Sequence, residues 1–485
     1  MTAAENRMRW LALYVLCLGD LMIVLDGTIV NVALPSIRDD LGFSQTSLAW
    51  VVNAYLLTFG GFLLLGGRLG DLFGHRRLFL AGIALFTVAS LACGVATSQE
   101  FLIVARAVQG LGGAVVSAVA LSLLMTLFTE QADRAKAMGF FGFVLSGGGV
   151  IGVLAGGVLT DILNWHWIFL VNLPVGIAVF VLSLRLLPTE RAYPATGRVD
   201  VAGAISVTAS LMLAVYAIVN GNEEGWTSGQ TLGLLGAAAA LLAIFVVIET
   251  RISSPLVPLG LFRNRNVSTS NVLGILMAAG MFAYFFFSAL YLQLILGYSP
   301  LEVGLAYLPG TIVWGAASLL LSDKLVMRYG IKPPMLTGLG LMAFALVLLA
   351  RTPVDGNWLI DIAPATIAIG LGAGIAFNPI LLAAMSGVAP EQAGLASGVV
   401  NTAFMMGGAV GLAVLASLAD SRSSELLASG DPSIVALNSG YHAAFLVGAL
   451  FVIASAIVGA ALLRVEAPQA HGHGMSAEPA LAETD

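Results

Sequence analysis

The chain has 485 residues, of which 59% are hydrophobic and only 10% are charged, and its net charge is -6. Soluble domains carry about 25% charged residues, so this composition excludes both a soluble globular protein and a disordered chain. A mean hydropathy of +0.96 also argues against an outer-membrane barrel, because its strands alternate apolar with polar residues. The composition therefore predicts an all-α integral membrane protein.

Apolar runs of about 20 residues, the length that spans a bilayer as a helix, occur fourteen times. In chain order we predict spans at 11–34, 48–66, 78–97, 102–126, 137–160, 167–187, 199–219, 231–249, 267–296, 302–321, 333–350, 359–385, 396–418 and 443–463. The first run carries Asp20 and Asp26 and is too long for a cleavable signal. The run 267–296 contains no charge, so we treat it as one tilted helix.

The basic residues are distributed unevenly over the loops that this count implies. With the N-terminus in the cytoplasm, 17 of the 21 Lys and Arg fall in cytoplasmic segments. Arg38, Arg351 and Arg422 fall in outer loops, and Arg106 lies within a span. Membrane proteins retain their positive charge on the cytoplasmic side. We therefore predict a multi-pass protein of the cytoplasmic (cell) membrane with both termini in the cytoplasm.

Longer polar stretches divide the spans into groups. The longest linkers are expected near 188–198, 250–266 and 420–440, and the first two bracket one pair of spans. We predict an N-terminal six-helix bundle at 1–192, an inserted helix pair at 193–252, a C-terminal six-helix bundle at 253–464 and a disordered cytoplasmic tail at 465–485.

Two polar turns suggest an internal repeat. Residues 66–77 and 319–332 each combine an Asp, a Gly and flanking basic residues after a corresponding span. Parallel six-helix repeats with a binding site near the membrane midplane are a known transporter architecture. This similarity between the two turns is weak on its own.

Motifs for catalysis, metal binding or nucleic-acid recognition are absent from the sequence. No HExxH, GxSxG or Walker loop occurs, and no basic run is longer than Arg76–Arg77. Cys17 and Cys93 lie in apolar runs and are expected to be packing residues. His471 and His473 of the tail are too few for a metal site. We predict no enzyme activity, no metal, no cofactor and no nucleic-acid partner.

Asp26 is the first candidate for proton coupling, because an ionisable group within a span costs about 2.5–3.5 kcal/mol on insertion scales. It follows Arg9 by 17 residues, roughly 25 Å along a helix, which places it toward the outer half of the membrane. A carboxyl there can be neutral when buried and ionised when a cavity opens to water. The alternative is a structural carboxyl that caps a helix or pairs with a basic group.

Asp20 and Arg106 complete the candidate proton-coupling set. Asp20 precedes Asp26 by six residues, about 240° around the helix, so it is either a second titrating site or only a hydrogen-bonding group. Arg106 is the only basic residue within a span, and it must face a cavity or pair with Asp20, Asp26 or backbone carbonyls. Moving Arg106 away from a carboxyl would promote proton uptake by that carboxyl.

Small residues recur in the fifth span, which reads SGGGVIGVLAGGVL at 146–159. Gly148, Gly152 and Gly156 repeat every four residues on one helix face, and Gly157 lies beside them. Such spacing lets two helices approach closely. Ordinary small-residue packing explains this pattern as well as a functional role does.

Aromatic and amide side chains inside the spans are candidates for a substrate cavity. The run FAYFFF at 282–287, followed by Tyr291, places six aromatic residues within ten. We expect some of them to face lipid, whereas others line an apolar cavity. The residues that we assign to such a cavity are Asn31, Asn53, Tyr55, Tyr284, Phe287, Tyr291, Asn378 and Asn401.

Six segments together make the chain resemble the fourteen-helix drug:proton antiporters of the major facilitator superfamily over residues 7–464. These segments are LDGTIVNVALPSI (25–37), WVVNAYLLTFGGFLLLGGRLGDLFGHRR (50–77), VARAVQGLGGA (104–114), WHWIFLVNLPVG (165–176), YLQLILGYSPLEVGLAYLP (291–309) and GLASGVVNTA (394–403). The resemblance implies a conformational-switch motif at Gly67, Asp71, Gly74, Arg76 and Arg77, and an antiporter motif on the glycine face of the fifth span.

The chain departs from the family pattern at three places. Leu72 and His75 stand where basic residues are frequent, so the switch motif carries fewer charges. Val153 replaces the Pro of the antiporter motif, which puts any kink supplied by that Pro in doubt. Phe404 and Met405 replace a frequent Arg-Gln pair, which would make the cavity more apolar.

The resemblance implies proton-coupled efflux of amphipathic drugs or antibiotics by alternating access, with protons, a small amphipathic substrate and the lipid bilayer as partners. The proton gradient would be the only energy source, and the chain would function as a monomer. One charge crossing 100 mV supplies about 2.3 kcal/mol, enough for a roughly 50-fold gradient per proton. The alternative is a dedicated exporter of an endogenous metabolite, siderophore or lipid on the same fold.

Overall fold

The structure, a computed structural model, describes residues 3–188, 200–252 and 254–464, and the regular structure within these ranges is entirely helical. The tail predicted at 465–485 and nearly all of the linker predicted at 188–198 lie outside the described residues. Within the described chain, fourteen helical segments are long and apolar enough to cross a membrane. The predicted fold class and number of spans are confirmed.

The first group of helices supplies six of these spans. It comprises α1 (Ala3–Leu41), α2 (Trp50–Phe73), α3 (His75–Gly94), α4 (Gln99–Leu127), α5 (Gln131–Ile162), α6 (Trp167–Leu170) and α7 (Asn172–Leu186). Ser98 fixes the start of α4, because its hydroxyl accepts from the N–H of Phe101 at 3.3 Å. The α5 helix continues without a break through Val153, the position of the absent Pro.

Two further helices and a last group of seven complete the fold. The inserted pair is α8 (Val201–Glu224) and α9 (Gly229–Arg251). The last group comprises α10 (Arg265–Leu290), α11 (Pro300–Ala316), α12 (Asp323–Tyr329), α13 (Lys332–Leu349), α14 (Ala363–Met385), α15 (Pro390–Ala428) and α16 (Ser433–Leu462). Turns of π-helix at Tyr291–Ile295, Ala317–Ser322 and Trp358–Ile362 extend α10, α11 and α14.

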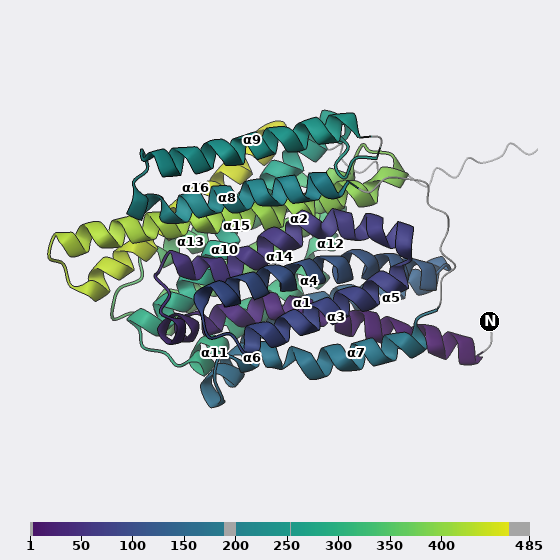
Figure 1. Ribbon diagram of the computed structural model, residues 1–485, viewed down its shortest axis with the longest axis horizontal. Helices are drawn as coiled ribbons and strands as arrows, with labels where there is room; N and C mark the ends of the chain where they lie inside the picture. The colour runs from purple at the N-terminus through teal and green to yellow at the C-terminus, as the bar shows by residue number, and fades with distance from the viewer. Residues whose placement is uncertain (1–2, 189–199, 253, 465–485) are drawn as a thin grey trace, which may run out of the picture.

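The prediction of a long linker at 420–440 was wrong. The α15 helix continues to Ala428 and α16 begins at Ser433, so that these ends project beyond the neighbouring helices (Figure 1). Residues 420–425 are polar but helix-compatible, and Arg422 pairs with Glu425 one turn later at 2.6 Å. The apolar run of the sequence therefore ends where these polar residues begin, but the helix continues through them.

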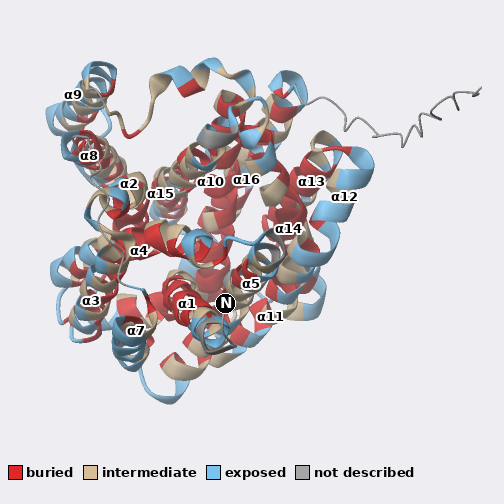
Figure 2. Ribbon diagram, turned by 90° about the vertical axis from the view of Figure 1, so that its right-hand side faces the viewer, coloured by how far each residue is buried: buried red, intermediate tan, exposed pale blue. Residues whose placement is uncertain are grey.

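The helices form two groups with the inserted pair at the edge, as the end-on view shows (Figure 2). The first half, α1–α7, meets the second half, α10–α16, mainly where α5 packs on α11 and α2 packs on α15. The α8 helix packs on both α2 and α15, so the inserted pair lies against both halves.

Candidate functional site

Two oppositely charged side chains form an ion pair in the centre of the first half. Asp26 of α1 has no exposed surface, and Arg106 of α4 is 1% exposed. Nη1 of Arg106 donates to Oδ2 of Asp26. Of the two carboxylates predicted as partners of Arg106, the structure places Asp26 beside it and not Asp20.

Three polar side chains surround this ion pair and satisfy its remaining atoms. Gln109 donates from Nε2 to Oδ1 of Asp26 at 2.7 Å and accepts from Arg106 at 2.7 Å. Asn172 at the start of α7 donates to the same Asp26 oxygen at 3.1 Å. Ser90 of α3 accepts from both amides, at 3.1 and 3.0 Å, and donates to a backbone carbonyl. One buried network therefore joins α1, α3, α4 and α7.

The guanidinium of Arg106 is held from two further directions. Its Nε donates to the backbone carbonyl of Val51 at 3.0 Å, which adds α2 to the network. Its charge lies 4.4 Å from the centre of the Tyr55 ring and 5.5 Å from that of Phe169, both within cation–π range. A planar guanidinium that makes several hydrogen bonds is well suited to a fixed geometry of this kind.

The chemistry available to this site is proton binding at Asp26. A buried ion pair is expensive to dehydrate and is maintained by complementary hydrogen bonds, so losing one charge leaves the other uncompensated. Neutralising Asp26 would remove the strongest link between α1 and α4. The network can therefore convert a protonation event into a change in helix packing.

We did not predict Gln109, Asn172 or Ser90 as site residues from the sequence. Gln109 lies one helical turn after Arg106 and within the quoted segment 104–114, and Asn172 lies within the quoted segment 165–176. Both amides are buried inside otherwise apolar helices. An uncharged polar side chain at a helical spacing from an intramembrane Arg was the signal that could have found Gln109.

Asp20 lies outside this network. Its Oδ1 accepts from the hydroxyl of Ser117 on α4 at 2.8 Å. Its Oδ2 is buried without a hydrogen-bond partner among the described residues. Asp20 therefore also connects α1 with α4, through one neutral hydroxyl instead of a guanidinium.

The glycine face of α5 forms two close helix contacts. A side chain at Gly148, Gly152 or Gly156 would clash with Leu21, Val24, Leu25, Thr28 or Ile29 of α1. Gly157 instead faces α11, where an added Cβ would lie 2.7 Å from the carbonyl oxygen of Pro300. The predicted glycine face thus packs α5 on α1, and Gly157 packs it on the second half.

Glycines on both helices allow the close contact between α5 and α11. Gly304 of α11 faces α5, and a Cβ there would lie 3.0 Å from the carbonyl oxygen of Val153. Nearby, Nε2 of Gln293 donates to the carbonyl of Val32 on α1 at 2.8 Å. Small residues and one hydrogen bond therefore bring the two halves together along this seam.

The predicted switch motif lies at the turn between α2 and α3. Gly74 has φ +93°, a conformation that favours glycine, and it ends α2 directly before α3 begins. Asp71 pairs with His75 over 3.3 Å, so the His that replaces a basic residue contacts the motif carboxylate. Arg76 donates to the carbonyl of Leu184 on α7 at 2.6 Å, whereas Gly67 has open space beside it and Arg77 is exposed.

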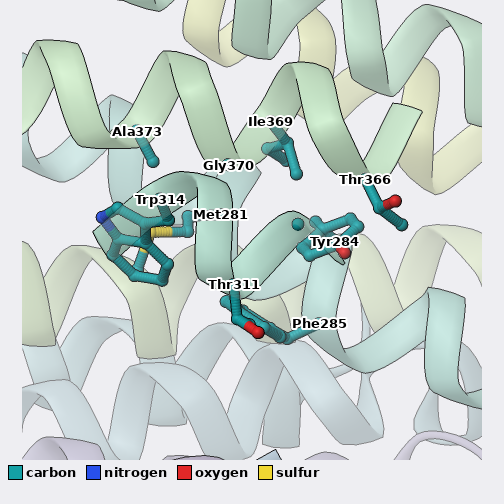
Figure 3. A pocket seen from close by; sticks show the side chains of 10 residues that line it. Met281, Tyr284, Phe285, Thr311, Trp314, Thr366, Ile369, Gly370 and Ala373 are labelled. Atoms are coloured by element: carbon teal, nitrogen blue, oxygen red, sulfur yellow. The ribbon is translucent and has the colours of Figure 1, made fainter. Parts of the chain in front are cut away.

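Eight residues were predicted to line one substrate cavity. Among the described residues the structure has a small cavity and a large one, and Tyr284 is the only one of the eight that lines either of them. Tyr284 lines a small cavity of about 10 Å³ with Met281, Trp314 and Ile369, between α10, α11 and α14 (Figure 3). That volume is near the minimum for one water molecule. The cavity assignment therefore stays a prediction for this set.

The other candidate cavity residues make individual contacts. Asn31 donates to the carbonyls of Gly27 and Thr28 in its own helix. Tyr291 donates to the carbonyl of Pro353, and Asn378 donates to Ser318. Phe287 packs on Tyr441 and Phe445. Asn53 and the hydroxyl of Tyr55 are buried without hydrogen-bond partners among the described residues, and Asn401 is partly exposed. Tyr55 thus carries an unused hydroxyl on the ring that packs against Arg106.

The aromatic run of α10 is more buried than predicted. We expected some of its six aromatic residues to face lipid, but five are buried and only Phe282 is partly exposed. Phe282 itself packs against Phe404 of α15, with ring centres 6.1 Å apart. The reason is that α10 contacts α13, α14, α15 and α16 of its own half and also α1 of the first half, so neighbouring helices cover most of its surface.

Comparison with known proteins identifies the family. Residues 16–412 match the Major Facilitator Superfamily. Puromycin resistance protein pur8 of Streptomyces alboniger is 39% identical over 456 residues, which cover 94% of this chain and 90% of that protein. Cephamycin export protein CmcT of Amycolatopsis lactamdurans is 39% identical over 92% of this chain and 91% of that protein.

Solved structures share the fold at low identity. The nucleoside transporter NupG aligns with a TM-score of 0.65 and 13% identity, over 94% of this chain and 100% of that chain. A bacterial homologue of the lysosomal transporter Spinster aligns with a TM-score of 0.65 and 16% identity, over 93% of this chain and 96% of that chain. The chain belongs to the Major Facilitator Superfamily and is a multi-pass membrane transporter rather than an enzyme.

Proposed function

We propose that the chain exports amphipathic drugs or antibiotics across the cell membrane in exchange for protons, with both termini in the cytoplasm. The observation that carries this proposal is the buried Asp26–Arg106 ion pair and its hydrogen-bond network. Relatives named for puromycin resistance and for cephamycin export support the direction and the substrate class.

Asp26 binds the coupled proton in this mechanism. While Asp26 is ionised, Arg106 and Gln109 hold α1 against α4. Protonation from the outer side removes the negative charge, so Arg106 keeps only neutral partners: Gln109, the Val51 carbonyl and the two aromatic rings. The weakened α1–α4 contact lets the first half change its packing, and release of the proton to the cytoplasm restores the ion pair.

Movement of the halves changes the contact between α5 and α11. Close approach at Gly157 and Gly304, together with the Gln293–Val32 hydrogen bond, closes this seam in the described conformation. Substrate would bind between the halves, within reach of the candidate cavity residues. The turn at Asp71, Gly74 and Arg76 would limit the opposite movement on the cytoplasmic side.

Growth of an efflux-deficient host tests this proposal. Wild type, Asp26→Asn and Asp20→Asn would be expressed at equal membrane levels on a panel of dyes and antibiotics that includes puromycin and a cephamycin. We expect wild type and Asp20→Asn to raise resistance to some compounds and Asp26→Asn to fail. Equal resistance in wild type and Asp26→Asn would contradict coupling through Asp26.

A second candidate function is export of one dedicated compound. The name of the cephamycin export protein, which matches nearly the whole chain, favours it. The two functions differ in breadth on the same panel. Resistance to several unrelated compounds supports the first, and resistance to one compound or to none supports the second.

A further inference from the structure

A large apolar cavity lies beside the inserted helix pair, away from the ion-pair network. Its volume is about 380 Å³, within the range of about 300–1,000 Å³ typical of ligand sites. Side chains from five helices and one linker line it, among them Leu64 of α2, Leu211 of α8, Phe245 of α9, Phe262 of the linker, Ile275 of α10 and Met406 of α15. The inserted pair thus forms one wall and the two halves form the other.

The side chains that line this cavity favour binding of a hydrocarbon group. Only Asn271 and Thr402 among its lining residues have polar side chains. Asn271 already donates to the carbonyl of Val267 at 2.9 Å, while the hydroxyl of Thr402 is buried without a partner among the described residues. A large apolar space favours an apolar occupant over water, because water there would find few hydrogen-bond partners.

One end of the cavity is covered by the linker between α9 and α10, which arches from one helix to the other (Figure 2). The linker is attached at both of its ends. Buried Glu249 of α9 accepts from the N–H of Val257 at 3.2 Å. Asn264 donates to the carbonyl of Gly387, before α15, at 2.8 Å. These two hydrogen bonds hold the linker over the cavity, so the cavity belongs to the folded structure.

Two exposed arginines mark the same end of the cavity. Arg251 follows the lining residue Phe245 by six residues on α9, which is about 9 Å along the helix. Arg265, at the start of α10, instead donates to the carbonyls of Leu462 and Ala461 at the end of α16. Arg263 directly follows Phe262 of the linker. Basic groups beside a gap between membrane helices attract anionic lipid head groups.

Most of the surface of α9 is exposed and available to the bilayer. Leu242, Ile244, Val246 and Val247 are all exposed apolar side chains between one and three turns before Arg251. A lipid that surrounds α9 therefore lies next to both the arginines and the cavity. In the proposed orientation these residues belong to the cytoplasmic leaflet.

We propose that the cavity binds the acyl chain of an anionic lipid, whose head group contacts Arg251 and Arg263. The inserted pair then serves as the outer wall of a lipid site between the two halves. The bound chain lies beside the contact of α2 with α15, where Gly60 faces Met405 and Met406. This lipid site is independent of the proton network and of the exported substrate.

Photolabelling of the full-length protein in nanodiscs tests the proposal. The probes are phosphatidylglycerol and phosphatidylcholine that carry a diazirine at the end of one acyl chain, and the labelled peptides are mapped by mass spectrometry. We expect phosphatidylglycerol to label the segments 256–262, 271–275 and 399–410 in preference to phosphatidylcholine. Labelling spread evenly over α9 and the other lipid-exposed helices would overturn the proposal.

A matched pair of substitutions separates cavity binding from bilayer contact. Val207→Trp fills the cavity from α8, and Val246→Trp adds the same bulk on the exposed face of α9. We expect Val207→Trp to reduce labelling of 399–410 by about tenfold and Val246→Trp to leave it unchanged. Equal labelling in both variants would overturn the proposal. If Val207→Trp does not fold, competition of the wild-type signal by unlabelled phosphatidylglycerol decides, and its absence counts against the site.

The head-group assignment has its own test. Arg251→Gln and Arg263→Gln should each lower the preference for phosphatidylglycerol over phosphatidylcholine by about fivefold. Arg422→Gln, at the far end of α15, is the control and should change nothing. An unchanged preference in Arg251→Gln and Arg263→Gln would overturn the head-group assignment. Stronger labelling of the cavity by a cationic alkylammonium diazirine, displaced by an exported drug, would identify a cargo site and overturn the lipid proposal.

Discussion

The two halves of this transporter share an architecture and differ in what they bury. The first half buries Asp20, Asp26 and Arg106. In the described part of α10–α16, the buried polar side chains are all uncharged, such as Thr366. An intramembrane charge must be paired or used, so the ionic chemistry is concentrated in one half.

The second half contains a buried aromatic cluster, whereas the first half contains the buried ion pair. Tyr284, Phe285 and Tyr307 form a cluster with ring centres 4.9 to 5.9 Å apart. The hydroxyl of Tyr307 lies 2.6 Å from that of Ser288 and donates to the Phe285 carbonyl at 3.1 Å. The comparison teaches that a repeated helix topology can hold a titratable network in one half and an apolar, hydrogen-bonded core in the other.

Removing the guanidinium should have the largest effect. Arg106→Leu leaves Asp26 buried without its charge partner, so we expect a loss of about 3–5 kcal/mol in stability together with loss of transport. Thermal unfolding of the purified protein measures the first and drug resistance the second. Arg422→Leu removes an exposed pair and should cost under about 1 kcal/mol. Similar melting temperatures for the two variants would argue against a structural role of the ion pair.

Overpacking the seam between the halves should have the next largest effect. Gly157→Val places a side chain against the α11 backbone, so we expect about 1–3 kcal/mol of destabilisation and impaired transport. Gly149→Val is the matched control, because the space beside Gly149 is open. For both variants, the midpoint of thermal unfolding measures the destabilisation and the drug resistance of the host measures transport. If Gly157→Val is tolerated as well as Gly149→Val, the close contact is not required.

Changing an aromatic residue of the second half should alter selectivity without affecting protons. Tyr284→Leu enlarges the small cavity between α10, α11 and α14, so we expect the relative resistance to different compounds to change by about tenfold. Proton movement per substrate should remain as in wild type. Tyr307→Phe, which removes only one hydroxyl, should leave selectivity unchanged. Loss of proton coupling in Tyr284→Leu would mean that coupling is not confined to the first half.

Neutralising the second carboxyl of α1 should have the smallest effect. In Asp20→Asn the amide oxygen can still accept from Ser117, so we expect stability within about 1 kcal/mol of wild type. Transport rates measured between pH 6 and 8 should retain the wild-type profile. A shifted or flattened profile would show that Asp20 also titrates during transport.

The sequence predicted the spans well because each is a long apolar run, and it predicted Asp26 and Arg106 because an intramembrane charge stands out. It missed the continuation of α15 to Ala428, where polar residues still favour a helix. It also missed Gln109, Asn172 and Ser90, since an uncharged polar residue within a span carries little signal until the fold brings its partner near.

The candidate cavity residues show a different limit of sequence reasoning. Type and position within a span suggested Phe287 and Tyr291, yet these side chains pack on Tyr441 or donate to Pro353. Whether an aromatic residue lines a cavity depends on the rotation of its helix against its neighbours. That rotation is fixed by packing across many residues and not by the local pattern.

Proton movement in proteoliposomes tests the central claim most directly. Wild type and Asp26→Asn would be reconstituted with an internal pH dye, and a compound to which wild type confers resistance would be supplied as a gradient. We expect substrate-driven proton movement with wild type, and substrate exchange without proton movement with Asp26→Asn. Equal proton movement per substrate in the two proteins would contradict the assignment of Asp26 as the coupling carboxyl.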